Sequence, residues 1–290
     1  MTAWKDVIWW SNDGLRLHAR DYPGEADTPP ILCLPGLTHN ARDFDALARR
    51  VAGRHRVLAI DLRGRGESAY AKDPMSYVPL TYAQDIAALL ADQQIDRFVV
   101  IGTSLGGIVA MLLAGMMPGR IAGALLNDVG PEVDPIGLAR VRGHVTRSSN
   151  WPTWMHAARA IQETHGGSYP DWGIEDWLAM AKRLYRLNNA GRIVIDHDPR
   201  IAEPFRVPGN QYGPEMWRAL AAFGTAPVLI VRGGRSDILS AAVAERMVAA
   251  LLEAELVTLP GIGHAPTLSE PAVQGAIDRL LARAGEPPSA

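Results

Sequence analysis

Short apolar runs alternate with helix-like patterns along most of the chain. The runs contain almost no polar alternation, which is typical of strands that are covered on both faces of a parallel sheet. Four of them occur in the first half of the sequence, at residues 31–36 (ILCLPG), 56–64 (RVLAIDLRG), 97–102 (RFVVIG) and 121–130 (IAGALLNDVG). The sequence therefore predicts an α/β fold with a mostly parallel central sheet and helices on both of its faces.

The alternation stops after residue 130 and resumes near residue 226. The intervening segment, residues 131–213, contains three helix-like patterns separated by Gly, Pro, Ser and Asn, the last of them at residues 173–187. We therefore expect one core domain built from residues 1–130 and 214–290, with residues 131–213 inserted between two strands as a helical cap.

Composition narrows the class of protein. The 290 residues carry a formal net charge of −2, which gives no electrostatic reason to expect nucleic acid or a membrane as partner. The longest apolar run, residues 108–117, is shorter than the roughly 20 residues that cross a bilayer, and no signal peptide is apparent. Cys33 is the single cysteine, which excludes an intramolecular disulfide. We expect a cytoplasmic protein and leave its oligomeric state open.

Ser104 lies in a glycine-rich turn between two apolar runs. Residues 102–106 read GTSLG, a G-x-S-x-G pattern with a predicted strand before it and a predicted helix after it. Such a turn lifts the serine hydroxyl above the sheet, where the free N–H groups and the positive dipole end of the helix point. The pattern predicts a nucleophile, and the alternative is a serine that only caps the helix.

A nucleophilic serine needs a base and an acid that orients the base. His264 follows the last predicted strand, and Asp237 follows the strand before it, so both are expected at the carboxyl edge of the sheet. We predict the catalytic set Ser104, Asp237 and His264. Asp128 is an alternative acid, because it also ends a predicted strand at that edge.

The oxyanion of an acyl-transfer reaction needs hydrogen-bond donors. The loop LPGLTHN at residues 34–40 and the turn after Ser104 offer the backbone N–H groups of Leu37 and Leu105. His39 is a further candidate, as a side chain that braces this loop.

Five motifs in order along nearly the whole chain resemble the α/β-hydrolase family, in the branch with a helical cap. They are LPGLTHN (residues 34–40), DLRGRGES (61–68), GTSLGG (102–107), GGRSD (233–237) and GIGH (261–264). The loop departs from the family's more usual His-Gly, because Pro35 precedes the glycine. The resemblance implies the α/β-hydrolase fold, and within it Arg63 is expected to be structural. The chain lacks HExxH, P-loop and GxGxxG motifs, so we expect neither a metal nor another cofactor.

The resemblance extends to carboxylesterases, enol-lactonases and carbon–carbon bond hydrolases, whereas epoxide hydrolases and haloalkane dehalogenases use a carboxylate in place of the serine. We expect hydrolysis of a carboxylic ester or lactone of a small apolar substrate through an acyl-enzyme on Ser104. Carbon–carbon cleavage of a vinylogous diketone, and a ligand receptor without turnover, are the alternatives.

The expected cap is rich in large apolar side chains. We predict a substrate pocket lined by Trp151, Trp154, Met155 and Trp177. The alternative is that these side chains form the cap's own core.

Overall fold

The computed structural model describes residues 4–145, 150–206 and 215–286. Eight strands of the described residues form one sheet in the order β1-β2-β4-β3-β5-β6-β10-β11. β1 and β2 pair antiparallel, as do β2 and β4, and the remaining pairs are parallel, so the predicted mostly parallel sheet is confirmed. The strands are β1 (Lys5–Trp10), β2 (Arg16–Tyr22), β3 (Ile31–Leu34), β4 (Val57–Asp61), β5 (Phe98–Thr103), β6 (Ile121–Asn127), β10 (Val228–Gly233) and β11 (Ala254–Leu259).

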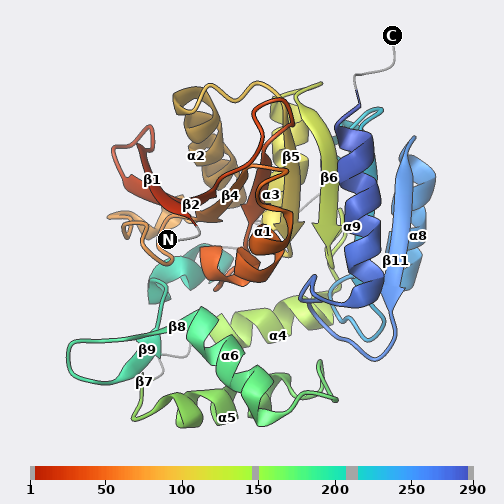
Figure 1. Ribbon diagram of the computed structural model, residues 1–290. Coiled ribbons are helices and arrows are strands. Elements are labelled where there is room, and N and C mark those ends of the chain that lie inside the picture. Colours follow the sequence, from red (N-terminus) through yellow and green to blue (C-terminus); the bar gives the residue numbers. More distant parts are fainter. Residues whose placement is uncertain (1–3, 146–149, 207–214, 287–290) are drawn as a thin grey trace.

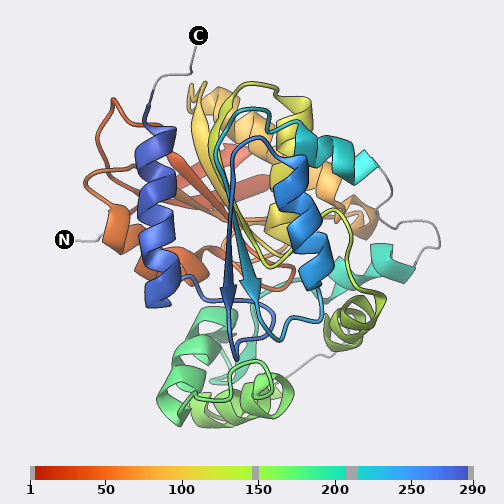
Figure 2. The ribbon, with the colours of Figure 1, turned by 90° about the vertical axis from the view of Figure 1, so that its right-hand side faces the viewer.

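Helices cover both faces of this sheet, as expected. One face packs against α1 (Asp45–Val51) and α9 (Pro271–Ala284). The other packs against α2 (Pro79–Asp92), α3 (Leu105–Met116), α7 (Glu215–Ala221) and α8 (Ala241–Ala250), and Figure 2 shows α8 and α9 on opposite sides. Every residue of β6 is buried between the two layers, which explains its continuous apolar pattern. Among the described helices, none combines the length and apolarity needed to cross a membrane.

Between β6 and β10 the chain builds a layer below the carboxyl ends of β5 and β6 (Figure 1). We call residues 135–206 the cap; the expected boundary at residues 213 and 214 lies outside the described residues. Besides its helices, the cap contains a short antiparallel sheet in the order β7-β9-β8, which the sequence did not predict. Its elements are α4 (Pro135–Val145), β7 (Asn150–Trp151), α5 (Trp154–His165), α6 (Ile174–Leu184), β8 (Tyr185–Leu187), β9 (Ile193–Ile195) and the 3-10 helix η3 (Pro199–Arg206).

The helix expected through residue 187 ends at Leu184 because the following residues pair as a strand. Tyr185 lies opposite Ile195 in an antiparallel ladder, so backbone pairing with a segment ten positions on takes the place of helical hydrogen bonds. α5, α6 and β9 enclose a separate apolar cluster that includes Ile161 and Trp177. The cap therefore has a core of its own.

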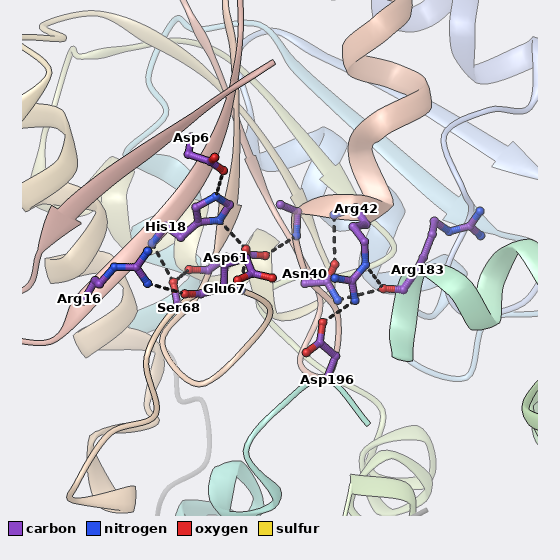
Figure 3. Close-up of polar contacts among 11 residues, drawn as sticks. Asp6, Arg16, His18, Asn40, Arg42, Asp61, Glu67, Ser68, Arg183 and Asp196 are labelled. Atoms are coloured by element: carbon purple, nitrogen blue, oxygen red, sulfur yellow. Dashed lines mark hydrogen bonds and ion pairs between the residues drawn. The ribbon is translucent and has the colours of Figure 1, made fainter. Parts of the chain in front are cut away.

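Asp61 at the end of β4 fastens several loops to the sheet (Figure 3). Its carboxylate accepts hydrogen bonds from the backbone N–H of Ala41 at 2.8 Å and of Glu67 at 3.1 Å. Its Oδ2 also lies 2.7 Å from Nδ1 of His18, whose Nε2 is 2.7 Å from Asp6. The network fixes the chain directly after the predicted oxyanion loop, because Ala41 follows that loop.

His18 makes this network dependent on pH. Burial lowers the pKa of His18, but hydrogen bonds and charges from Asp61 and Asp6 outweigh burial and raise it above the ordinary value. The stabilisation is therefore complete below about pH 6.5 and is lost as the pH rises through the folded-state pKa. We expect His18→Gln to lower the free energy of unfolding by about 2 kcal/mol near pH 6 and by clearly less near pH 9. Urea unfolding of both proteins at the two pH values measures this, and equal losses would contradict it.

Arg42, in the 3-10 helix η1 (Ala41–Phe44), links the core to the cap (Figure 3). Its Nε donates to the backbone carbonyl of Arg183 at 2.8 Å, and its Nη2 lies 2.6 Å from Asp196. Asn40 donates to the same carbonyl at 3.0 Å. The cap is thus hydrogen-bonded to the last residue of the predicted oxyanion loop, Asn40, and to Arg42 shortly after it.

Candidate active site

Ser104 occupies a sharp turn between β5 and α3. Its φ of +52° lies in the left-handed region that serine rarely adopts. A Cβ on Gly106 would lie 2.0 Å from the Leu34 carbonyl oxygen, so only glycine allows the chain to pass there. The Ser104 side chain makes no capping hydrogen bond to α3, which removes the capping alternative. Instead, the turn presents the hydroxyl at the carboxyl edge of the sheet.

His264 lies between Ser104 and Asp128. Its Nε2 is 3.0 Å from Oγ of Ser104, and its Nδ1 is 2.8 Å from Oδ2 of Asp128. The Asp128 side chain is fully buried and that of His264 is 11% exposed. With the imidazole proton on Nδ1 donated to Asp128, the Nε2 lone pair can accept the Ser104 proton. The three side chains therefore have the arrangement that a nucleophile, a base and an orienting acid require.

Several backbone contacts hold Asp128 in place directly after β6. Its φ is +56°, and its N–H donates to the carbonyl of Val231 at 2.7 Å. The N–H of Gly233 donates to its Oδ1 at 2.9 Å, which leaves Oδ2 for His264. A Cβ on Gly233 would lie 2.5 Å from the carbonyl oxygen of Gly263. The loop that carries His264, residues 260–270 and called here the histidine loop, therefore passes closely over the end of β10.

The prediction that Asp237 contacts His264 is wrong. Arg140 of α4 approaches both carboxylate oxygens of Asp237, with Nε 2.5 Å and Nη2 2.7 Å away. This hydrogen bonding is the main reason that the pKa of Asp237 lies below its ordinary value. A Cβ on Gly137 would come within 1.9 Å of the Asp237 carbonyl oxygen, so α4 lies directly on the loop that follows β10. The cap therefore engages Asp237, and Asp128 is the carboxylate against His264.

The predicted oxyanion donors flank Ser104. Leu105 is the first residue of α3, so its N–H is one of the groups that a helix leaves without an internal partner. On the other side, a Cβ on Gly36 would lie 3.8 Å from Cβ of Ser104 and 3.6 Å from Cδ2 of His39. Leu37 follows in the same loop, and its donor role stays a prediction. His39 contacts Asp43 through Nδ1, within the same segment.

A cavity of about 860 Å³ opens above Ser104 between the core and the cap. Trp151 lines it, but the other predicted pocket residues do not. Trp177 is buried in the cap's own core, Trp154 packs against that core, and Met155 is an exposed side chain. The prediction is wrong for these three: α5 and α6 turn Trp154 and Trp177 toward the core that they share, and Met155 faces solvent. Six arginine or lysine side chains and three carboxylates also line the cavity.

Two residues that the sequence analysis missed tie the histidine loop down. Asn127 donates from Nδ2 to Oγ1 of Thr103 at 3.1 Å and to the carbonyl of Pro266 at 2.8 Å. Tyr169 of the cap donates to the carbonyl of Ala265 at 2.5 Å. The sequence could have indicated Asn127, because it is a polar amide at the end of an apolar strand. Nothing in the sequence near Tyr169 indicates its contact. Across the described part of the chain, no group of three His, Cys, Asp or Glu side chains could hold a metal ion.

Known proteins resemble this chain over almost its whole length. Residues 31–274 match the sequence model described as the Alpha/beta hydrolase family. A 3-hydroxybutyrate-oligomer hydrolase from Cupriavidus necator is 33% identical over 267 residues, which are 89% of this chain and 90% of that protein. Esterase YbfF of Escherichia coli is 28% identical over 276 residues, which are 92% of this chain and 98% of that protein. The crystal structure of an alpha/beta hydrolase from Novosphingobium aromaticivorans shares 57% identity, with a TM-score of 0.94 over 98% of this chain and 99% of that one.

Proposed function

This chain belongs to the alpha/beta hydrolase family, and on that basis we propose that it cleaves a carboxylic ester through an acyl-enzyme on Ser104. The observation that carries the proposal is the placement of His264, with Ser104 at 3.0 Å on one side and Asp128 at 2.8 Å on the other. The esterase and oligomer hydrolase among its relatives support ester bonds as the target.

The geometry suggests a two-stage reaction. Nε2 of His264 accepts the Ser104 proton as Oγ attacks the ester carbonyl carbon, and Asp128 stabilises the resulting imidazolium. The N–H groups of Leu37 and Leu105 donate to the negatively charged oxygen of the tetrahedral intermediate. The intermediate then collapses, and His264 returns the proton to the departing alcohol. Water attacks the acyl-enzyme by the same steps and releases the acid.

The cavity points to a more polar substrate than the sequence suggested. Its lining is rich in charged side chains, and five of its six cationic side chains pair with carboxylates, so its walls suit a substrate with polar groups better than a wholly apolar one. The Cupriavidus relative is named for oligomers of 3-hydroxybutyrate, which carry both an ester and a terminal carboxylate. We therefore propose short esters of hydroxy acids as the substrate class.

The dimer of 3-hydroxybutyrate and its methyl ester form a matched pair of substrates for this proposal. We expect kcat/KM for the internal ester bond to be at least about tenfold higher for the free acid, which corresponds to one charge-assisted hydrogen bond. High salt should shrink the difference, because it screens charges in a solvent-open cavity. Both rates are measured by following the release of 3-hydroxybutyrate by chromatography.

Three outcomes of this experiment would count against the proposal. Equal rates on the two substrates would mean that the protein does not recognise the free carboxylate of its substrate. Hydrolysis of neither ester, together with turnover of a vinylogous diketone, would favour the carbon–carbon bond alternative. No turnover of any of the three would favour a receptor.

A further inference from the structure

The turn at residues 61–68 buries two arginines whose surroundings differ. Arg63 is 1% exposed and fully neutralised. Its Nε and Nη2 lie 2.7 and 2.6 Å from the carboxylate of Asp85, and its Nη1 and Nη2 lie 2.9 and 3.0 Å from that of Asp13. Two carboxylates thus share this guanidinium, as suits the structural role expected for Arg63.

Arg65, two positions later, is 0% exposed and lacks such neutralisation. Within the described residues it forms no ion pair, and its Nη2 has no hydrogen-bond partner. Its Nη1 donates to the carbonyl of Arg63 at 2.6 Å and to the hydroxyl of Tyr82 at 2.9 Å. A buried charge without a counter-charge is strongly unfavourable, so the presence of Arg65 here calls for an explanation other than stability.

The remaining contact of Arg65 reaches the predicted oxyanion loop. Its Nε donates to the backbone carbonyl of Leu37 at 2.9 Å, and both groups are buried. The rings of Tyr82 and Tyr77 lie 4.9 and 5.6 Å from its Cζ, where cation–π attraction holds the guanidinium without neutralising it.

The charge of Arg65 is also felt at the wall of the cavity. His197 lines that cavity, and its backbone pairs with that of Arg65. Burial, and after it the charge of Arg65, lower the pKa of His197 to about 4. The Arg65 guanidinium therefore lies close enough to the cavity wall to affect His197, although Arg65 itself does not line the cavity.

We propose that Arg65 is a positioning residue of the oxyanion site. Its Nε holds the Leu37 backbone so that the Leu37 N–H faces the tetrahedral intermediate, and its unneutralised charge favours the negative oxygen formed there. The inference rests on the proposed function, because the Leu37 N–H matters in this way only for acyl transfer. The substrate carbonyl carries little charge and the intermediate a full one, so the effect should fall on kcat and not on KM.

Arg65→Gln and the matched control Arg63→Gln test this role. For Arg65→Gln we expect kcat to fall about 30-fold or more with KM within about threefold of wild type, somewhat less than for loss of an oxyanion donor itself. The inhibition constant of butylboronic acid, which forms a tetrahedral anion on the serine, should rise by a similar factor. Arg63→Gln leaves Asp85 buried without its partner, so its Tm should fall further than that of Arg65→Gln while kcat changes little.

A folded Arg65→Gln enzyme with wild-type kcat would overturn the proposal. So would an inhibition constant of butylboronic acid that changes only as much as KM does. If that variant does not fold, Arg65→Lys takes its place, because lysine keeps a charge between the two tyrosines but cannot reproduce the fork of hydrogen bonds. We then expect about a tenfold loss in kcat. Wild-type kinetics in a folded Arg65→Lys enzyme, or failure of both variants to fold, would leave Arg65 with a purely structural role.

Ser104→Ala separates this inference from the proposed function. If the alanine variant still turns over ester, or if boronate does not inhibit the wild type, the proposed function fails. If both behave as expected and Arg65→Gln does not, only the role of Arg65 fails.

Discussion

Replacing Ser104 by alanine is expected to lower kcat by about 10⁴- to 10⁶-fold, with the fold intact. The loss is large because the substitution removes the Oγ that lies 3.0 Å from Nε2 of His264 and that would form the acyl-enzyme. Alanine removes only the hydroxyl, so the backbone at φ +52° stays as it is. Initial rates of ester hydrolysis at saturating substrate measure the effect, and a thermal melt checks the fold.

Ser240→Ala is the matched control for this substitution. Ser240 caps α8 by accepting a hydrogen bond from the N–H of Val243, so its loss should cost about 1 kcal/mol of stability and leave kcat unchanged. A fluorophosphonate should label the wild-type chain once, at Ser104, and should not label Ser104→Ala. Label on a peptide outside residues 102–106, or wild-type turnover by the alanine variant, would contradict the acyl-enzyme on Ser104.

Asp128→Asn is expected to lower kcat by roughly 10⁴-fold. The asparagine amide cannot accept the Nδ1 proton of His264 as a carboxylate does, so the ring adopts the tautomer that cannot receive the Ser104 proton. The substitution keeps the size of the side chain, and Oδ1 can still accept from the N–H of Gly233. Steady-state kinetics together with circular dichroism distinguish lost chemistry from lost folding.

Asp237→Asn serves as the comparison for Asp128→Asn. Asp237 pairs with Arg140 of the cap, so its loss should keep kcat within a few fold and act on KM or on stability. This pair of variants decides between the two aspartates that the sequence left as candidates. An inactive Asp237→Asn beside an active Asp128→Asn would mean that the contact seen here is not the one used in catalysis.

Features that depend on local pattern could be read from the chain. Continuous apolar runs predicted buried parallel strands, and the glycines around Ser104 predicted a turn that only small residues permit. His264 was placed correctly near Ser104 because a loop that follows a parallel strand must lie at the carboxyl edge of the sheet. The short antiparallel sheet of the cap was missed, since its strands are too brief to show a period of their own.

The sequence by itself determined the α/β core, the turn that presents Ser104 and the edge at which His264 lies, because each follows from neighbouring residues or from strand direction. Only the tertiary structure decided which aspartate faces His264. Asp128 and Asp237 both follow strands that end at that edge. The folded chain holds Asp128 against His264 through the N–H of Gly233, and it brings Arg140 of the cap onto Asp237 from 97 positions away. The tertiary structure also decided which side chains line the cavity. Trp177 faces the cap's own core because α5 and α6 pack against each other, and that packing is a property of the folded chain.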